Sequence, residues 1–560
     1  MKNPYFILAA IVLLLCAPTS GHAQGWQWAR DAADSSGSSG TSAATDKWGN
    51  VYVAGSFLNS ISFGAVTVTS PYTYNVFLTK YDSLGNVLWV KYANSPGGTN
   101  YRVASDLSGN IYLTGHYHGS ITFGDITLTS SGLALFLAKY DTGGSIIWAK
   151  ATGHVAEGGL FYPTAVSTDG KCNIYVAGGF GGDNLNLISA TGSTDTLSPQ
   201  IFIFKYDSTG NLIWAKGESD TFKSTEIHSI AIDRFDNIYV TGICGNNAIF
   251  DTIAFASLGQ GMFLAKYDTA GHIEWLRGGG GWATYGYAIE ADNGRAVTTD
   301  LNGNVYVAGT YDSTVTFGDS TFLISGQAVF LVKYDSAGNA LWARSTHGGY
   351  HAWEDYPYGM ATDALGNIYL AGTYDDTFGF GGIVIMTASD ADIFLVKFDS
   401  DGNASGGAVS SGGSTSGFAE PVSVNVDLSG NAYITGGFMY EPTLAFGGTI
   451  LPDGSSNGTM FIAKYSNNAV TPVMRTSQMS LYPNPATDAL NLQYGTSSHW
   501  ITDIAIYDML GRGVLERHLD ENNPGNQTVH IQLPLMEDGM YLLKARNADG
   551  VECLRFVVKR

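Results

Sequence analysis

The sequence predicts an all-β protein: a seven-bladed β-propeller closed by an N-terminal strand, followed by a small C-terminal β-sandwich. Three repeated strands carry this prediction. The first is GNVYVAG, whose closing glycines recur at nearly constant spacing at Gly55, Gly115, Gly178, Gly242, Gly309, Gly372 and Gly436. The second resembles FLTKYD at Phe77, and the third resembles LWVK at Leu88. A period held over most of a chain is typical of stacked copies of one supersecondary unit.

The composition favours strands and turns over helices. The chain has 560 residues, of which 44% are hydrophobic, only 14% are charged and 71 are glycine. Such a chain can bury a large core. Its net charge of -21 argues against a nucleic-acid partner, because proteins that bind phosphates present a basic surface.

The N-terminus predicts export. Residues 1–24 read as a secretory signal peptide, with Lys2 ahead of an apolar run and small residues near the cleavage site. No later apolar run reaches the length of a transmembrane helix. Three widely separated cysteines remain, Cys172, Cys244 and Cys553, and this odd number predicts unpaired thiols rather than a disulfide framework.

Each repeat contains four strands, A to D in chain order, in which the three motifs above are B, C and D. The sixth repeat has Gly406 in place of the strand D tryptophan, and the seventh has no strand D of its own. The missing sequence precedes the first repeat, at Trp28–Arg30. Pairing of this stretch beside Phe461–Tyr465 would remove two open sheet edges, which favours a closed propeller over an open solenoid.

Acidic turns join the strands. Each A–B connection places an Asp four residues before an Asn, as in Asp46 and Asn50, and the C–D connection from Asp82 repeats this spacing. An Asp that caps its own turn explains the pattern. Calcium ligation by these residues is the open alternative, and no other cofactor is expected. The basic residues of strands C and D, such as Lys80, are interpreted as snorkelling side chains beside these turns.

As a set, GN[VI]Y[VL][AT]G, FLxKYD and LWAK resemble the SBBP-type β-propeller repeat family over residues 25–468. The resemblance implies a propeller fold. It implies no common activity, because the motif residues all belong to the repeating strands.

Strand direction alternates, so the A–B and C–D turns share one face of the predicted ring, the short-turn face. The variable B–C and D–A connections share the other, the long-loop face, where a ligand site is expected. The candidate ligand-binding residues are Trp282, Tyr285, Tyr287, Tyr350, His351, Trp353, Glu354, Asp355 and Tyr358. They could stack on a sugar or peptide, or they could fill the central channel or pack under a loop.

No catalytic arrangement emerges from the sequence. Paired carboxylates for glycoside hydrolysis could come from Glu290, Asp292, Glu354 and Asp355, but so acidic a chain holds many such pairs. A sialidase-like site requires three arginines on the ligand face. Only two arginines, Arg102 and Arg295, are expected on the long-loop face at positions outside the repeat pattern.

Two histidine pairs also fall short of a site. His116 with His118, and His347 with His351, have no third zinc ligand at a supporting spacing. The sequence therefore favours a non-enzymatic binding or adhesion module for a glycan or protein. The alternative is a secreted carbohydrate-active hydrolase that uses carboxylates on the long-loop face.

A different composition begins after a linker at residues 469–478. Residues 479–560 contain alternating apolar positions, such as Ile504 and Ile506, that predict a small antiparallel sandwich. This segment resembles the type A C-terminal sorting domain of the type IX secretion system. The residues that carry the resemblance are Tyr482, Pro483, Asn484, Pro485, Gly511, Arg512, Gly539, Tyr541 and Lys559. The resemblance implies the type IX machinery as a partner, and a secreted or surface-attached protein of a Gram-negative cell.

Overall fold

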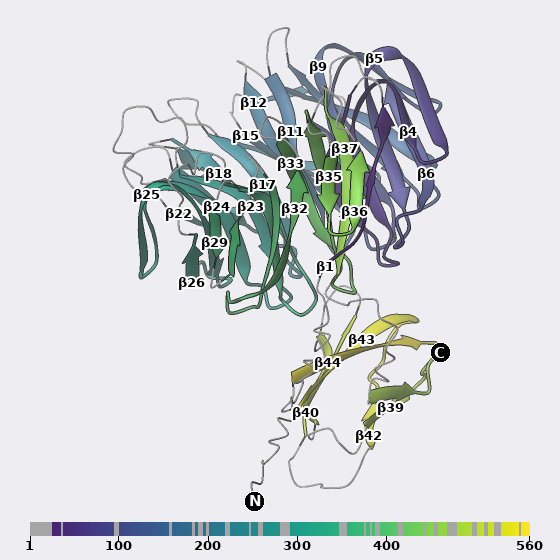
Figure 1. Ribbon diagram of the computed structural model, residues 1–560, viewed down its shortest axis with the longest axis vertical. Coiled ribbons are helices and arrows are strands. Elements are labelled where there is room, and N and C mark those ends of the chain that lie inside the picture. The colour runs from purple at the N-terminus through teal and green to yellow at the C-terminus, as the bar shows by residue number, and fades with distance from the viewer. Residues whose placement is uncertain are drawn as a thin grey trace, which may run out of the picture.

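The structure is a computed structural model, and it describes most of the chain after residue 24. The described residues are 25–34, 37–94, 100–155, 160–181, 185–188, 194–197, 201–218, 225–245, 248–255, 261–279, 292–346, 355–374, 377–380, 383–386, 392–412, 418–440, 443–452, 457–466, 479–494, 501–508, 513–519, 528–547 and 550–559. Within them every regular element is a β-strand (Figure 1). The predicted signal peptide lies outside these residues.

The repeated motifs form four-stranded antiparallel units, each named here by its strand A. In chain order their strands are β3 (Ser38–Thr45), β4 (Val51–Phe63), β5 (Val66–Tyr81) and β6 (Val87–Asn94); β7 (Arg102–Ser105), β8 (Ile111–Phe123), β9 (Ile126–Tyr140) and β10 (Ile146–Val155); β11 (Leu160–Thr168), β12 (Ile174–Gly181), β15 (Ile201–Tyr206) and β16 (Leu212–Glu218); β17 (Glu226–Ile232), β18 (Ile238–Cys244), β21 (Gly261–Tyr267) and β22 (Ile273–Gly279); β23 (Asn293–Thr299), β24 (Val305–Phe317), β25 (Ser320–Tyr334) and β26 (Ala340–Ser345); β27 (Tyr356–Thr362), β28 (Ile368–Tyr374), β31 (Asp392–Phe398) and β32 (Ala404–Gly412); and β33 (Phe418–Val426), β34 (Ala432–Met439) and β37 (Thr459–Ser466).

The β33 unit takes its strand D from the start of the chain. β1 (Gly25–Asp31) pairs antiparallel with β37, with Trp28 opposite Lys464 and Arg30 opposite Ile462. Figure 1 shows the green strands of the late chain next to the purple strands of the early chain. The predicted pairing of Trp28–Arg30 beside Phe461–Tyr465 is therefore present in the structure.

Additional pairing links the end of strand D to the B–C hairpin of the following unit. β2 (Ala33–Asp34), which follows β1, pairs with β4, and Asn94 of β6 pairs with Thr122 of β8. β10 pairs with β13 (Leu185–Ile188), which pairs with β14 (Thr194–Leu197), and β32 pairs with β35 (Thr443–Phe446), which pairs with β36 (Thr449–Pro452). Two separate hairpins are β19 (Ile249–Phe250) with β20 (Ile253–Ala254), and β29 (Thr377–Phe380) with β30 (Ile383–Met386). Neighbouring units are thus joined by main-chain hydrogen bonds as well as by side chains.

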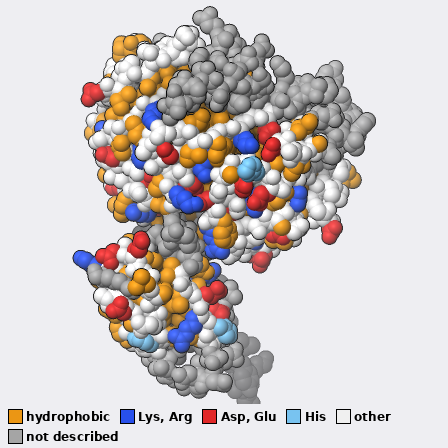
Figure 2. All heavy atoms as spheres, turned by 180° about the vertical axis from the view of Figure 1, so that it is seen from behind, with side chains coloured by type: hydrophobic (Ala, Val, Ile, Leu, Met, Phe, Trp, Pro, Cys, Tyr) orange, Lys and Arg blue, Asp and Glu red, His pale blue; other side chains and the backbone are white. Residues whose placement is uncertain are grey.

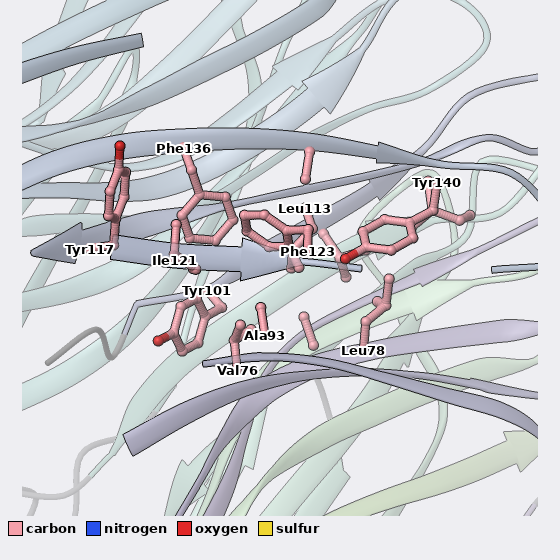
Figure 3. Close-up of a cluster of buried hydrophobic side chains, with 14 of the residues drawn as sticks. Val76, Leu78, Ala93, Tyr101, Leu113, Tyr117, Ile121, Phe123, Phe136 and Tyr140 are labelled. Carbon is pink, nitrogen blue, oxygen red and sulfur yellow. The ribbon is translucent and has the colours of Figure 1, made fainter. Parts of the chain in front are cut away.

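The core lies between the sheets. In Figure 3, Val76, Leu78 and Ala93 of the β3 unit face Phe123 and Phe136 of the β7 unit. Another cluster joins Val51 and Phe77 of the β3 unit to Tyr433 and Ile462 of the β33 unit. Burial on both faces explains why successive residues of strands B and C are apolar instead of alternating.

The predicted turn chemistry is confirmed in atomic detail. In the first A–B turn, Asp46 Oδ1 accepts the N–H groups of Trp48 and Asn50, both at 2.9 Å, while Oδ2 accepts the Asn50 amide and the Tyr52 hydroxyl. Gly49 holds the left-handed position with a φ of +81°. The same bonds recur at Asp106, Asp169, Asp233, Asp300, Asp363 and Asp427. Four donors occupy each carboxylate, which argues against its service as a calcium ligand.

The strand C lysines lie beside the turn aspartates as predicted, with Lys80 Nζ 3.7 Å from Asp46 Oδ2, but they do not snorkel into solvent. Lys80 is only 6% exposed, and its ammonium lies 5.0 Å from the centre of the Tyr52 ring. It donates a 3.1 Å hydrogen bond to the Thr142 carbonyl in the C–D turn of the next unit. Burial lowers the pKa of Lys80. A lysine clamp of this kind connects units, which solvated side chains would not do.

The strand D tryptophans make the second contact between units. The Trp89 indole donates to the same Thr142 carbonyl, and its ring lies where a Cβ on Gly144 would stand. The equivalent pairs are Trp28 on Gly85, Trp148 on Gly210, Trp214 on Gly271, Trp275 on Gly338 and Trp342 on Gly402. The C–D turn glycine therefore serves two purposes, because it also adopts a positive φ that side chains disfavour.

The C-terminal segment forms two sheets around one core. β38 (Met479–Tyr482), β39 (Ala489–Tyr494) and β42 (Thr528–Gln532) form one sheet, and β41 (Gly513–His518), β40 (Ile501–Asp508), β43 (Gly539–Asn547) and β44 (Gly550–Val558) form the other. Ile504 and Ile506 are fully buried between them, as the alternating pattern predicts. None of the described residues belongs to a helix that is long and apolar enough to cross a membrane.

The sorting motif residues hold the end of this segment together. Asn484 Oδ1 accepts the N–H of Val557, and the Ala486 N–H donates to the Val557 carbonyl. The Lys559 N–H donates back to Ala486 O. Tyr541 stacks on Phe556, and its hydroxyl donates to Glu537 O. Residues 482–486 therefore anchor the final strand, while Gly511 and Arg512 lie outside the described residues.

The cysteine prediction holds where it can be checked. No disulfide joins Cys172 and Cys244. Cys172 takes the left-handed turn position that glycine holds in other units, with a φ of 63°.

Candidate functional site

The strands A surround an open cavity of about 300 Å³. All of its lining residues come from β3, β7, β11, β17, β23, β27 and β33. This volume is at the lower end of the range for small-ligand pockets. The cavity is therefore the place where side chains from all these units converge.

β-bulges aim side chains into the cavity. Each bulge inserts one extra residue into a strand A, and the extra residues are Thr41, Thr164, His228, Arg295, Tyr358 and Val422. All six line the cavity. A bulge commonly redirects a side chain in this way next to a functional site.

The glycine that closes each strand B makes room for the bulge. A Cβ at Gly242 would overlap the Glu226 carbonyl, and one at Gly309 would overlap the Asn293 carbonyl. In the β7 unit, whose described pairs include no bulge, Gly115 instead lies against the Tyr101 ring. The glycine that closes strand B, which is the same in every unit, thus makes room for the strand A bulge, whose residue varies.

Most polar groups around the cavity hold neighbouring strands together. Ser42 Oγ accepts the Val103 N–H, Ser229 Oγ accepts the Val297 N–H, and Ser423 Oγ accepts the Ala43 N–H. At the base of the strands, Thr45 Oγ1 donates to Val426 O, Ser105 Oγ to Thr45 O, Thr168 Oγ1 to Ser105 O and Thr362 Oγ1 to Thr299 O. These bonds make the lining rigid.

Arg102 bridges three units with one guanidinium group. Its Nε donates to Thr164 O at 2.6 Å, and its Nη1 donates to Thr41 O and Tyr101 O. Burial lowers the pKa of Arg102 to about 10. All of these acceptors are neutral carbonyls, and Nη2 makes no hydrogen bond with any described residue. The charge of Arg102 therefore has no carboxylate counterion among them.

Arg295 and two tyrosines form a second polar group. The Arg295 guanidinium lies 5.3 Å from the centre of the Tyr356 ring, and the Tyr356 and Tyr358 rings are 6.1 Å apart. A cation over an aromatic face is held by the ring quadrupole. Burial raises the pKa of Tyr358 well above its usual value, so its hydroxyl stays neutral.

His228 connects this group to an acid at the rim. Its Nδ1 is 3.2 Å from Gly294 O and its Nε2 is 3.3 Å from Glu226 Oε2. Both partners are acceptors, so both bonds form only when the ring carries two protons. The bond from His228 lowers the pKa of Glu226. His228 thus links the cavity wall to the Glu226 carboxylate at its rim.

The cavity wall differs in charge from the rest of the molecule. Among the described residues that line it, Arg102, Arg295 and His228 can carry charge, and none is Asp or Glu. On the side of the molecule that Figure 2 shows, basic and acidic side chains are interspersed with hydrophobic ones. In a chain of net charge -21, this wall is locally positive.

The structure describes only part of the predicted ligand site. Tyr358 lines the cavity, and Asp355 is buried, with 1% of its surface exposed. Asp292 is also buried and accepts the Asp312 N–H. The remaining candidates, Trp282, Tyr285, Tyr287, Tyr350, His351, Trp353 and Glu354, lie outside the described residues, as does Glu290. Both described carboxylates are therefore buried, and that of Asp292 supports the backbone.

The histidine pairs gain no support as metal sites. His116 is buried, whereas His118, two residues further along β8, is exposed. His347 and His351 lie outside the described residues. In the part of the chain that the structure describes, no three His, Cys, Asp or Glu side chains are grouped to hold a metal.

The sequence indicated that Arg102 and Arg295 stand outside the repeat positions, and both line the cavity. Sequence reasoning missed His228 and Glu226. A bulge adds a single residue within a strand and leaves no periodic signal, so only the glycine opposite it could have indicated the position.

Two family models match the chain. Residues 217–242 match a β-propeller repeat model, SBBP. Residues 480–559 match a secretion system C-terminal sorting domain. Both resemblances found in the sequence are therefore confirmed.

Similarity to individual proteins is distant. An uncharacterized WD repeat-containing protein, L264 of Acanthamoeba polyphaga mimivirus, is 22% identical over 546 residues, which cover 79% of this chain but only 38% of that relative. Among solved structures, PorZ, a surface component of the type IX secretion system of Porphyromonas gingivalis, is 10% identical, with 93% of this chain and 81% of PorZ covered and a TM-score of 0.22. A protein of unknown function from Dyadobacter fermentans is also 10% identical, with 78% and 99% covered and a TM-score of 0.32.

Proposed function

We propose, from the premise that this chain is an SBBP-type β-propeller repeat protein exported by type IX secretion, that it is a non-enzymatic module that binds a glycan or a protein outside the cell. Its sorting domain directs it to the cell surface or the extracellular space of a Gram-negative bacterium. The proposed divisions are a signal peptide at 1–24, a propeller at 25–468, a linker at 469–478 and the sorting domain at 479–560.

The propeller is proposed to have seven blades in a closed ring. The pairing of β1 with β37 supports closure. So do the hydrogen bond from Thr45 to Val426 and the apolar cluster shared by the β3 and β33 units. A closed ring leaves no open edge at which a further strand could pair.

Both ends of the repeat region lie on the short-turn face. Gly25 pairs with Ser466, so the chain enters and leaves the repeats at adjacent positions. Strand C of the other units ends at the short-turn face, as in Tyr81 before the Asp82 turn. The link to the sorting domain therefore starts on the short-turn face, and the proposed binding face is directed away from it.

One observation carries the binding proposal: the cavity lining varies from unit to unit while the rest of each unit repeats. The bulge positions hold threonine, histidine, arginine, tyrosine and valine on a common backbone. Trp282 and Trp353 belong to the segments that lead into β23 and β27, the strands that supply Arg295 and Tyr358. The proposed ligand site is thus the mouth of the cavity together with these segments.

The hydrolase alternative lacks support. Asp292 and Asp355 are buried, and Asp292 accepts a main-chain hydrogen bond. A general acid and base must reach the scissile bond and a water. Buried carboxylates are poorly placed for either task.

A glycan array probed with the mature chain, residues 25–560, tests the proposal. Trp282→Ala and Trp353→Ala should each weaken binding of any ligand found by about tenfold or more, because stacking aromatics act as hot spots. Trp48→Ala is the matched control, since Trp48 is 54% exposed in an A–B turn on the short-turn face. Normal binding with lowered stability in the first two variants would mean that these side chains pack the channel.

A further inference from the structure

We propose that the cavity selects an anionic ligand, and specifically an acidic sugar of a glycan. The inference rests on the proposed binding function and specifies the chemistry of the same site. It is carried by two arginines and a histidine that converge on the cavity wall without an acidic residue among the described lining.

Arg102 contributes a fixed charge that its surroundings leave uncompensated. Three carbonyls consume its Nε and Nη1 donors and hold the guanidinium in one orientation. A guanidinium has five N–H donors in a rigid fork, so the two on Nη2 remain for a ligand. Both N–H groups of Nη2 can donate to the oxygen atoms of an anionic group, and such charge-assisted bonds are stronger than bonds to neutral acceptors.

Arg295 supplies a second charge in a different setting. Its guanidinium lies against Tyr356, and Tyr358 stands beside that ring. His228, in the adjacent β17, lines the same wall, and its ring nitrogens lie within hydrogen-bond distance of Gly294 O and Glu226 Oε2. The Glu226 carboxylate, whose pKa both His228 and Arg295 lower, lies at the rim and does not line the cavity. The wall therefore attracts a negative group into the cavity itself.

The shape and lining favour a sugar over an acidic protein segment. A cavity of about 300 Å³ admits one or two small rings. Hydroxyl groups of Thr41, Thr164 and Ser423 are fixed around it by bonds to the backbone, and each retains acceptor capacity for a sugar hydroxyl. The neighbouring tyrosine rings offer a surface on which a sugar ring can lie.

The local potential can be measured without any ligand. Val422→Cys places a thiol on the cavity wall, and Ser120→Cys places one at an exposed position on β8. The reaction rates of each thiol are compared for a sulfonate-bearing and a trimethylammonium-bearing methanethiosulfonate, with the parent chain as background for the native thiols. Relative to Ser120→Cys, Val422→Cys should favour the anionic reagent by about tenfold or more, because charges focus counterions into a cleft.

Charge variants identify the source of that preference. Arg295→Gln in the Val422→Cys background should reduce it, whereas Arg295→Lys should retain most of it. Arg102→Gln should reduce it further, and Arg102→Lys is its control because Arg102 also holds the backbone. The same ratio of anionic to cationic reaction rate at both thiols, or a ratio that favours the cationic reagent at Val422→Cys, would overturn the inference.

Ligand selectivity is tested with oligogalacturonate and its fully methyl-esterified form, which has the same sugars without the charge. The acid should bind the full mature chain at least about tenfold more tightly than the ester, and Arg295→Gln should abolish the difference. Equal binding of acid and ester, or binding of acidic peptides in place of acidic sugars, would overturn the inference while leaving the binding function standing. Absence of all glycan binding with a retained thiol preference would overturn the acidic-sugar inference and leave an anion site, whereas absence of both glycan and protein binding would contradict the proposed function.

Discussion

The Lys464 ammonium donates a 2.9 Å hydrogen bond to the Ser83 carbonyl, although 381 residues separate the two in the chain. Lys80 makes the same bond to the unit that follows it, through Thr142. The last unit therefore contacts the first through the contact that joins neighbouring units elsewhere. Trp28 adds the second part of that contact, because its indole also donates to Ser83 O.

The proposed closure predicts that Trp28→Ala strongly destabilises the ring. Trp28 is 7% exposed, and its truncation removes both the packing on Gly85 and the bond to Ser83. The free energy of unfolding should fall by about 3 to 5 kcal/mol. Chemical denaturation measures it, with Leu323→Ala, at a side chain that is 82% exposed, as the control. Deletion of residues 25–30 should in addition expose a sheet edge and cause association on gel filtration. An unchanged stability and a monomeric profile would contradict the closure.

Removal of a tyrosine hydroxyl should lower the free energy of unfolding where the hydroxyl bonds to a turn carboxylate, and should not lower it where the hydroxyl has no partner. Tyr52→Phe removes a bond to the buried Asp46 carboxylate and should lower the free energy of unfolding by about 1 to 3 kcal/mol. Tyr81 in the same unit is equally buried, yet its hydroxyl has no hydrogen-bond partner among the described residues. Tyr81→Phe should therefore be neutral or stabilising. Similar losses in both variants would show that ring packing, and not the carboxylate bond, determines the result.

The same carboxylates predict that calcium removal has no effect on the fold. Both oxygens of Asp46 are occupied by donors from its own turn. EDTA should leave the Tm of the mature chain unchanged, and added calcium should not raise it. A Tm that depends on calcium would place metal ligands in segments other than these turns.

Glu218 predicts a loss of stability as the pH rises. It is 9% exposed at the end of β16, and burial, opposed by a bond from the Asp251 N–H, raises its pKa to about 7. A folded-state pKa above the unfolded value means that the stabilising contribution is complete below about pH 4.5 and is lost as the pH passes about 7. The loss amounts to about 3 kcal/mol.

The measurement is the free energy of unfolding of Glu218→Gln between pH 4.5 and 8. The variant should be more stable than the parent at pH 8 and similar to it at pH 4.5, because glutamine retains the acceptor without the charge. Asp125→Asn, in an exposed turn, should leave the pH profile unchanged. A parallel shift of the Glu218→Gln profile at every pH would exclude titration of this group as the cause.

Features that repeat from unit to unit could be predicted from the sequence, and features that occur in one unit or between units could not. The turns around Asp46 and the strand at Trp28 could be predicted because periodicity fixes their neighbours. Lys80 was misread, because its contacts lie in the next unit and the pattern within one unit resembles a solvated lysine. His228 was invisible because a bulge position varies from unit to unit and carries no pattern. Trp282 and Trp353 stay predictions, since the structure does not describe them.

The sorting domain predicts separate failures of export and of folding. A chain that ends at residue 478 should accumulate in the periplasm while its repeats fold normally, because the apolar core within residues 479–559 is built without side chains from the repeats. Cell fractionation and protease resistance of the retained chain measure the two properties. Delivery of the truncated chain to the cell surface would contradict the role of this domain.

Gly406 gives the last prediction. In the other units the strand D tryptophan lies on the C–D turn glycine of the next unit, as Trp342 does on Gly402. The β27 unit is followed by the β33 unit, whose strand D is β1, so no continuous C–D turn connects its strands C and D and a tryptophan at Gly406 would have no glycine to lie on. Trp26 of β1 contacts this unit at another place, where its indole donates to Val409 O in β32.

Trp26→Ala should therefore lower the free energy of unfolding by about 3 kcal/mol, close to the effect of Trp342→Ala. Gly406→Trp should not restore the stability that Trp26→Ala loses. The introduced indole would have no C–D turn glycine to pack on. Denaturation of the two single variants and of the double variant decides the point. Rescue by Gly406→Trp would contradict this explanation. It would show that β32 can accommodate a tryptophan at this position even though β1 supplies strand D of the following unit.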